Sequence, residues 1–207
     1  EQGKVWGSAK IKNLEHPDFV IDANAFINLA EIQSFIPDTL VKDISGELTA
    51  EINSYGRLNL DSITEQAYDI ILKQSILKFE ANNIAVTLPD TLQKLSNFNG
   101  LVKVAQDTIS FLKMSGVAAD IDFSIDKATI SNVYNAVMNN QKDIISISKL
   151  KGNTADIDFS IDAATIVNAY NALTMNGQDT ISISKMNGIA AGTDFSVDKV
   201  TIANAYN

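Results

Sequence analysis

The 207-residue chain has no cysteine and a single histidine, His16. The lack of cysteine excludes disulfides, thiolate metal ligands and cysteine nucleophiles, and it leaves the redox compartment undetermined. His16 precedes Pro17 in an expected loop, no serine lies in a Gly-x-Ser-x-Gly pattern, and the ten glycines are scattered singly. The sequence therefore favours a protein that is not an enzyme, and we expect no cofactor.

Positive charge and long apolar runs are also scarce. The net charge is −9, from 16 basic and 25 acidic residues, which disfavours binding to nucleic acid or to anionic lipid headgroups by charge. No apolar run approaches the roughly 18 to 20 residues that span a bilayer. A 45% hydrophobic share is typical of a folded globular chain. Because the sequence starts without methionine and stops inside a repeat unit, we expect it to be a piece of a longer protein.

The second half of the chain is a tandem repeat with a period of 36 residues. Asp107, Asp143 and Asp179 open units at 107–142, 143–178 and 179–207, the last one truncated. Such periods are typical of stacked supersecondary units. Each unit reads as two alternating strands and a short helix, with the first helix predicted at 127–140 and capped by Asp126.

The second strand of each unit carries the repeated stretch "ADIDFSID" at 119–126 and 155–162, and "AGTDFSVD" at 191–198. Alternation places Ile121, Phe123 and Ile125 on one face and the acidic side chains on the other. The turn before this strand falls either at 115–116 or at 118–120, and the second site is favoured because the third copy has Gly192 there.

Three aspartates at i, i+2 and i+6 raise the question of a calcium site. A calcium loop needs oxygen ligands that converge, with glycine to bend the chain. Here apolar residues alternate with the acids, and Gly192 replaces Asp120 in the third copy. The pattern favours a solvated face and a helix cap, so we expect no metal site.

Residues 1–106 form a less regular β-rich half with one amphipathic helix at about 61–75, where Ser62 and Glu65 make a capping box. Without a flexible linker between the halves, we expect one continuous sheet. The predicted fold class is β-rich α+β: an elongated, twisted and curved antiparallel sheet built from β-β-α repeats, with short helices packed on part of it. Its apolar side is either core beneath the helices or, where they do not reach, an uncovered strip.

The chain resembles the AsmA-like family of the Gram-negative envelope, in a form similar to that of Bacteroidetes proteins. The likeness lies in "VWGSAKIKNLEHPDFVIDANAFINLAEIQSFIPD", "VKDISGELTAEINSYGRLNLDSI" and "ANNIAVTLPDTLQKLSNFNGLVKVAQDTISFLKMSGVAADIDFSI", and in the apolar-x-Gly steps that end at Gly46, Gly100 and Gly116. The resemblance implies a curved sheet with an apolar concave face. It also implies a periplasmic location, a tether to the inner membrane outside this piece, and phospholipid transport or outer-membrane biogenesis. The lack of a membrane helix and the close similarity of the repeats depart from that pattern.

On this interpretation phospholipid acyl chains are the expected partner, because they need only a continuous apolar surface. In the first half of the chain Ala23 is also a candidate. The residues expected to face lipid are Val20, Phe26, Ile121, Phe123, Ile125, Ile157, Phe159, Ile161, Phe195 and Val197. The alternative is a structural or adhesive repeat module that binds protein partners. Either form is expected to self-associate through the truncated C-terminal edge.

Overall fold

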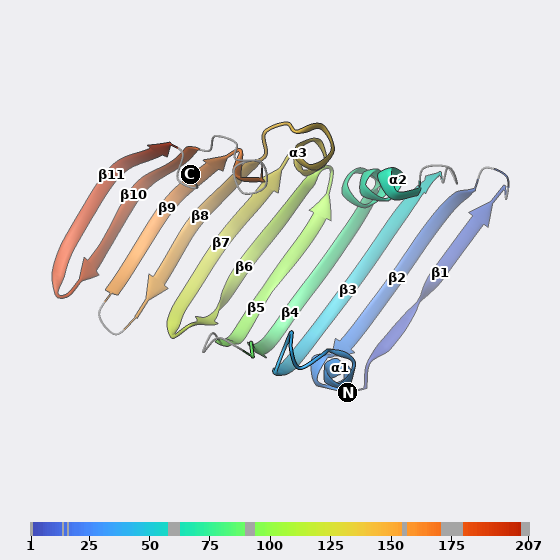
Figure 1. Ribbon diagram of the computed structural model, residues 1–207, viewed down its shortest axis with the longest axis horizontal. Helices are drawn as coiled ribbons and strands as arrows, with labels where there is room; N and C mark the ends of the chain where they lie inside the picture. Colours follow the sequence, from blue (N-terminus) through green and yellow to red (C-terminus); the bar gives the residue numbers. More distant parts are fainter. Residues whose placement is uncertain are drawn as a thin grey trace.

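The computed structural model describes residues 2–13, 15, 17–57, 63–89, 94–154, 157–170 and 180–203, without the side chains of 63–65. They form one open sheet of eleven antiparallel strands in which each strand pairs with its neighbours in sequence (Figure 1). The predicted fold class and the single continuous sheet are confirmed.

Five strands belong to the first half and six to the repeats. Those of the first half are β1 (Lys4–Lys12), β2 (Asp18–Asn28), β3 (Asp43–Arg57), β4 (Ser75–Thr87) and β5 (Lys94–Ala105). Those of the repeats are β6 (Thr108–Ala118), β7 (Ile121–Ser131), β8 (Ile144–Asn153), β9 (Ile157–Val167), β10 (Thr180–Ala190) and β11 (Thr193–Ala203).

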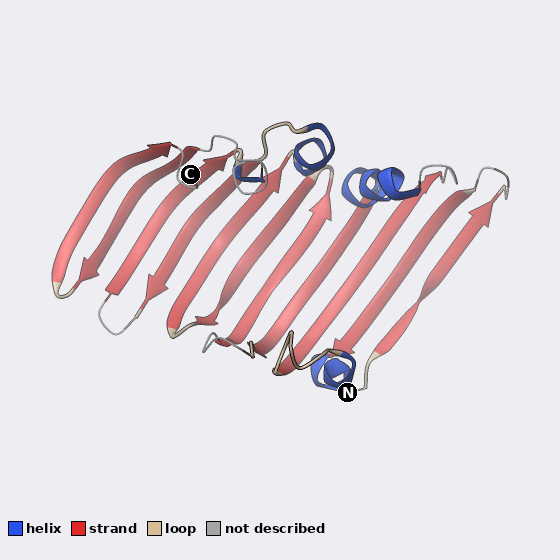
Figure 2. Cartoon of the chain, in the orientation of Figure 1, coloured by secondary structure: helices blue, strands red, loops and turns tan. Residues whose placement is uncertain are grey.

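The helices are short and lie at the ends of the strands (Figure 2). At one end of the sheet lies α1 (Leu29–Ile32), followed by the 3-10 turn η1 (Gln33–Phe35). At the other end lie α3 (Val133–Asn139) and α2 (Ile63–Asp69), which continues as the π-helical turn η2 (Ile70–Gln74). The helix predicted at 61–75 is confirmed over its described part. Of its capping box, Ser62 and the side chain of Glu65 lie outside the described residues, as does His16.

Two-residue turns close two of the repeat hairpins. Ala119 and Asp120 both have positive φ, 48° and 64°, and in the third unit Ala191 and Gly192 have 49° and 77°. Two successive residues of this kind are typical of the type I′ turn, whose twist matches that of the strands. The turn favoured at 118–120 is therefore confirmed, and Gly116 lies inside β6.

The helix prediction at 127–140 is half wrong. Residues up to Ser131 belong to β7, where Ile130 pairs with Ile109 and with Ile145, and only Val133–Asn139 is helical. Asp126 lies within the strand and caps nothing. The helical periodicity was misleading because Ile130, an apolar strand residue, falls at helical spacing from Val133.

Asp107, at the start of the unit, caps α3 instead. Its Oδ1 accepts a hydrogen bond of 2.5 Å from the backbone N–H of Tyr134. In the next unit Asp143 is buried, with 3% of its surface exposed, and it accepts a hydrogen bond of 3.0 Å from the backbone N–H of Tyr170. The aspartate that opens each of these two units thus fixes the chain that follows the hairpin.

A left-handed residue interrupts the first strand of each hairpin at the same place. Lys113, Lys149 and Lys185 have φ of 50°, 51° and 50°. Strict alternation would place Phe111 and Met114 on opposite faces. However, the Met114 side chain occupies the space where Gly100 would carry a Cβ. The left-handed step therefore shifts the alternation by one residue and keeps the apolar side chains of β6 on one side of the sheet.

Candidate functional site

One side of the sheet, here called the apolar face, carries rows of apolar residues that run across the strands. One row crosses all eleven strands through successive register pairs. Its members are Gly7, Ala23, Ile52, Leu77, Val104, Ile109, Ile130, Ile145, Ile166, Ile181 and Ile202. Strands spaced about 4.8 Å apart give this row a length of about 48 Å.

A second row lies next to it and also crosses every strand. Its members are Val5, Ala25, Ala50, Phe79, Val102, Phe111, Ala128, Ile147, Ala164, Ile183 and Val200. Neither row contains a polar side chain. The apolar face is thus continuous across the first half and the repeats.

In the repeats a third row alternates phenylalanine with glycine: Gly116, Phe123, Gly152, Phe159, Gly188 and Phe195 pair in that order. The ring of Phe159 occupies the space where Gly152 would carry a Cβ, and Phe195 Cζ lies 2.6 Å from that position at Gly188. The centroid of the Phe123 ring lies 6.4 Å from that of Phe98 on β5. Gly152 and Gly188 therefore make room for the phenylalanine of their own hairpin.

The π-helical turn η2 covers one end of this face. The Cβ position of Gly56 lies 3.2 Å both from Ile70 Cγ1 of η2 and from Phe19 Cε1, so η2 packs on the apolar face there. Ile70, Leu72 and Val104 are buried at this end. Among the described residues no second layer of strands covers the remaining area, because each strand packs against its neighbours in the sheet.

Eight of the ten candidate residues lie on the apolar face. Ile125, Ile161 and Val197 pair with apolar residues of the adjacent strands, and the three phenylalanines fill the glycine row. Ile121 and Ile157, at the hairpin end, are 40% and 45% exposed. The structure therefore brings these eight residues together on one face of the sheet, where Ile161 is buried at 8% exposure.

The other two candidates, Val20 and Phe26, lie on the opposite face. Val20 pairs with Lys10 and Tyr55, and it alternates with Phe19, which lies on the apolar face. The expected grouping of Val20 and Phe26 with Ala23 is therefore wrong, because residues an odd number of positions apart in an unbroken strand lie on opposite faces. Ala23 itself lies on the apolar face.

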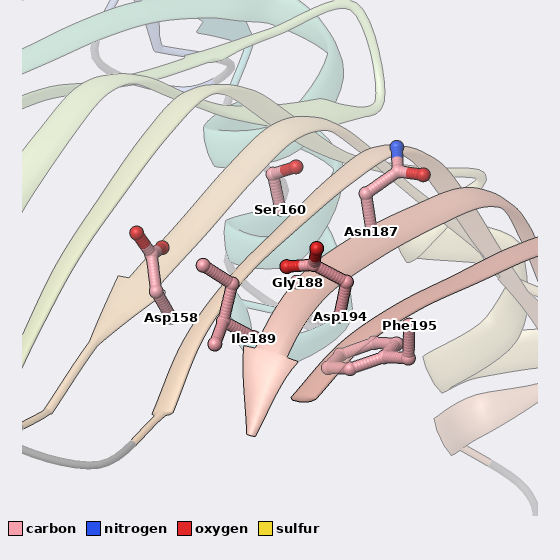
Figure 3. Close-up of a pocket in the computed structure, with 7 residues that line it drawn as sticks. All are labelled: Asp158, Ser160, Asn187, Gly188, Ile189, Asp194 and Phe195. Carbon is pink, nitrogen blue, oxygen red and sulfur yellow. The ribbon is translucent and has the colours of Figure 1, made fainter. Parts of the chain in front are cut away.

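The aspartates of the repeats do not converge. On the polar face a shallow depression of about 350 Å³ contains Asp158 and Asp194 (Figure 3). Ile189 on β10 pairs with both of them, so one whole strand separates the two carboxylates. The described part of the chain has no group of three or more side chains that could hold a metal ion.

An apolar depression of about 310 Å³ lies at the other end of the apolar face from η2. Val86, Leu95 and Ala118 pair across β4, β5 and β6 and line it together with Leu88. Lys94 also lines it and is exposed. A cationic side chain beside an apolar hollow suits an amphiphile that has an anionic head.

A row of alternating charge, formed by the left-handed lysines and by aspartates of the neighbouring strands, was not predicted from the sequence. The flanking register pairs place Lys113, Asp126, Lys149, Asp162, Lys185 and Asp198 in line across six strands. Lys149 Nζ lies 3.6 Å from Asp126 Oδ2. The sequence signal was the break in alternation between Phe111 and Met114, which recurs in every unit.

The fold is a single open antiparallel sheet whose last six strands are three hairpins of one repeat. No described helix has both the length and the apolar composition that crossing a membrane requires. No protein-family model, no curated protein and no solved structure matches the chain.

Proposed function

We propose that the apolar face binds lipid acyl chains and forms part of a path for phospholipid in the bacterial envelope. The observation that supports this is the pair of uninterrupted apolar rows across all eleven strands. A row of about 48 Å is longer than the roughly 30 Å hydrocarbon core of a bilayer. The resemblance to AsmA-like proteins supplies the rest of the proposal: a periplasmic location and a tether to the inner membrane.

The proposal is consistent with the chemistry of acyl chains. They offer no hydrogen-bonding groups to recognise, so a binding surface needs apolar area and few polar atoms, and each methylene removed from water contributes about 0.8 kcal/mol. The apolar rows meet that requirement. Lys94, beside the apolar depression, would lie near an anionic headgroup.

Two matched double variants test the proposal. Ile121→Asn with Ile157→Asn changes the apolar face, where these side chains are 40% and 45% exposed. Ile144→Asn with Ile189→Asn changes the polar face at nearly equal exposures, 41% and 46%. Binding of a fluorescent phosphatidylethanolamine is measured by anisotropy. Bound lipid is identified by native mass spectrometry followed by extraction.

We expect the first variant to bind about tenfold more weakly, since losing roughly 1.4 kcal/mol of apolar contact has that effect. The second should bind as the unmodified protein does. Equal binding by both variants, or no lipid bound by the unmodified protein, would contradict the proposal.

The second proposed function is a structural or adhesive repeat module that binds protein. The repetition of contacts between hairpins supports it: Ser148 Oγ donates to Lys127 O at 3.3 Å, and Ser184 Oγ donates to Ala163 O at 3.4 Å. Regular contacts of this kind are typical of solenoid arrays that propagate by adding units. Protein that binds no lipid would favour this second function.

A further inference from the structure

β11 is the last strand of the described sheet, and its outer edge carries a defined order of side chains. Among the described residues β11 pairs only with β10, so one side of its backbone lacks a partner. Unpaired edges accept an added strand through backbone hydrogen bonds, and the side chains decide which strand fits. The earlier repeats are a guide to what could pair with this edge, because each earlier hairpin presents an equivalent edge to the hairpin that follows.

Contacts between successive hairpins are made by a Ser-Lys pair. Ser148 of β8 donates to the carbonyl of Lys127, and the next residue, Lys149, lies 3.6 Å from Asp126. One unit later Ser184 of β10 donates to the carbonyl of Ala163 at 3.4 Å, and Lys185 lies opposite Asp162. The same two positions therefore recur at both hairpin boundaries.

The residues on either side of that pair are apolar. Ile147 pairs with Ala128 and Leu150 with Ile125, while Ile183 pairs with Ala164 and Met186 with Ile161. The last strand of one hairpin (β7 or β9) thus has the pattern apolar, Asp, polar or small, apolar. The first strand of the next hairpin (β8 or β10), which runs antiparallel to it, has the pattern apolar, Ser, Lys, apolar. These facing pairs set the register.

β11 has the same pattern as β7 and β9, and among the described residues no strand lies on its outer side. Val197, Asp198, Lys199 and Val200 stand where Ile125, Asp126, Lys127 and Ala128 stand in β7. Asp198 is exposed. It faces Lys185 on one side only, whereas Asp126 has Lys113 on one side and Lys149 on the other.

We infer that the β11 edge is a docking site for an antiparallel strand of sequence apolar-Ser-Lys-apolar, the first strand of a further hairpin of this repeat. Its serine faces the carbonyl of Lys199, its lysine faces Asp198, and its apolar residues face Val197 and Val200. A second copy of the folded chain does not fit. Its β6, β8 and β10 are each paired on both sides, and β1, "KVWGSAKIK", which among the described residues pairs only with β2, has no Ser-Lys pair.

A peptide with the sequence of Ile144–Asn153, "IISISKLKGN", is the probe. Its fluorescent form is titrated with the folded protein, and backbone amide shifts in the NMR spectrum locate the site. We expect saturable binding that shifts amides of β11 and leaves β1 unchanged. The Lys149→Glu peptide, which places a carboxylate opposite Asp198, should bind at least tenfold more weakly.

The charge-swapped protein separates recognition of side chains from simple edge pairing. In the Asp198→Lys protein the order of the two peptide affinities should reverse, so that the Lys149→Glu peptide binds more tightly than the unmodified peptide. Circular dichroism checks that this exposed substitution leaves the fold intact. The inference is overturned if both peptides bind equally to both proteins, if neither peptide binds, or if the shifts map to β1. Lipid binding plays no part in this readout.

Discussion

The Oδ1 atom of Asp107 accepts a hydrogen bond of 2.5 Å from the backbone N–H of Tyr134, 27 residues further along the chain. Asp143 and Tyr170 repeat the relationship at 3.0 Å over the same separation. A cap normally comes from the residue just before the helix. Here the residue before the first strand of the hairpin provides it, so strand, return strand and following helix are fixed together as one unit.

Asp143→Ala is expected to lower the free energy of unfolding by about 1 to 2 kcal/mol, because the carboxylate is buried and the N–H of Tyr170 would lose its acceptor. Asp143→Asn keeps an oxygen acceptor and should lose less. The measurement is the urea midpoint, with amide exchange at Tyr170 as a local readout. Asp158→Ala, on the exposed polar face, is the control and should be close to neutral. Equal losses at 143 and 158 would contradict this role for the cap.

Most of the strands were predictable because their signal is local. Alternation in "DTISISKMNG" and its relatives predicts half-buried strands wherever they occur, and Ala191 with Gly192 predicts the turn between them. The order of strands followed from short connections, since sequential strands joined by hairpins pair with one another.

The apolar face was only partly predictable, because its continuity depends on backbone conformations that alternation cannot reveal. Lys149 is a lysine at φ 51°, a conformation that residues other than glycine rarely adopt. Without that step Ile147 and Leu150 would lie on opposite faces. The cap by Asp107 was missed for another reason: its partner is distant in sequence, and Asp126 stood at a more familiar spacing.

Gly152 and Phe159 are expected to be energetically coupled. A Cβ at Gly152 would collide with the ring of Phe159, so Gly152→Ala should cost about 1 to 3 kcal/mol by overpacking. In the Phe159→Ala background the ring is gone, and the same glycine substitution should be nearly neutral. A double-mutant cycle from urea unfolding measures the coupling, with an expected size of about 0.5 to 3 kcal/mol. Additive effects would show that the ring does not occupy this space in solution.

Asp18 and Arg57 form a cross-strand pair at the end of β2 and β3, with Arg57 Nε 2.8 Å from Asp18 Oδ1 and Nη2 3.2 Å from Oδ2. The hydrogen bond from Arg57 lowers the pKa of the Asp18 carboxyl below its ordinary value. Because the folded-state pKa is the lower one, the pair stabilises the protein above the unfolded-state pKa, and that contribution is lost as pH falls through the folded-state pKa.

In Arg57→Ala the pKa of Asp18, followed by NMR titration, should rise toward its ordinary value. The stability difference between this variant and the unmodified protein should be small, because both side chains are exposed, and it should vanish in acid. A pKa of Asp18 that does not change on removal of Arg57 would show that the pair is not formed in solution.

Lys149 tests the left-handed step that keeps the apolar face continuous. Lys149→Val places a β-branched residue at φ 51° and should cost about 1 to 2 kcal/mol. Lys151→Val, two residues later in the same strand and also exposed, has no such conformation and should be neutral or slightly stabilising. Lys149→Gly relieves the strain but loses the contact with Asp126, which contributes at most about 1 kcal/mol between exposed side chains.

The three variants together distinguish strain from charge. If the left-handed conformation dominates, thermal unfolding should rank Lys149→Gly as stable as the unmodified protein or more so, and Lys149→Val as the least stable. If the ion pair with Asp126 dominates, glycine and valine at 149 should destabilise alike, and 0.5 M salt should reduce both effects. Because Lys113 and Lys185 share this conformation, the first ranking would mean that the shift in alternation at all three lysines is set by local backbone geometry and that the charge row is secondary.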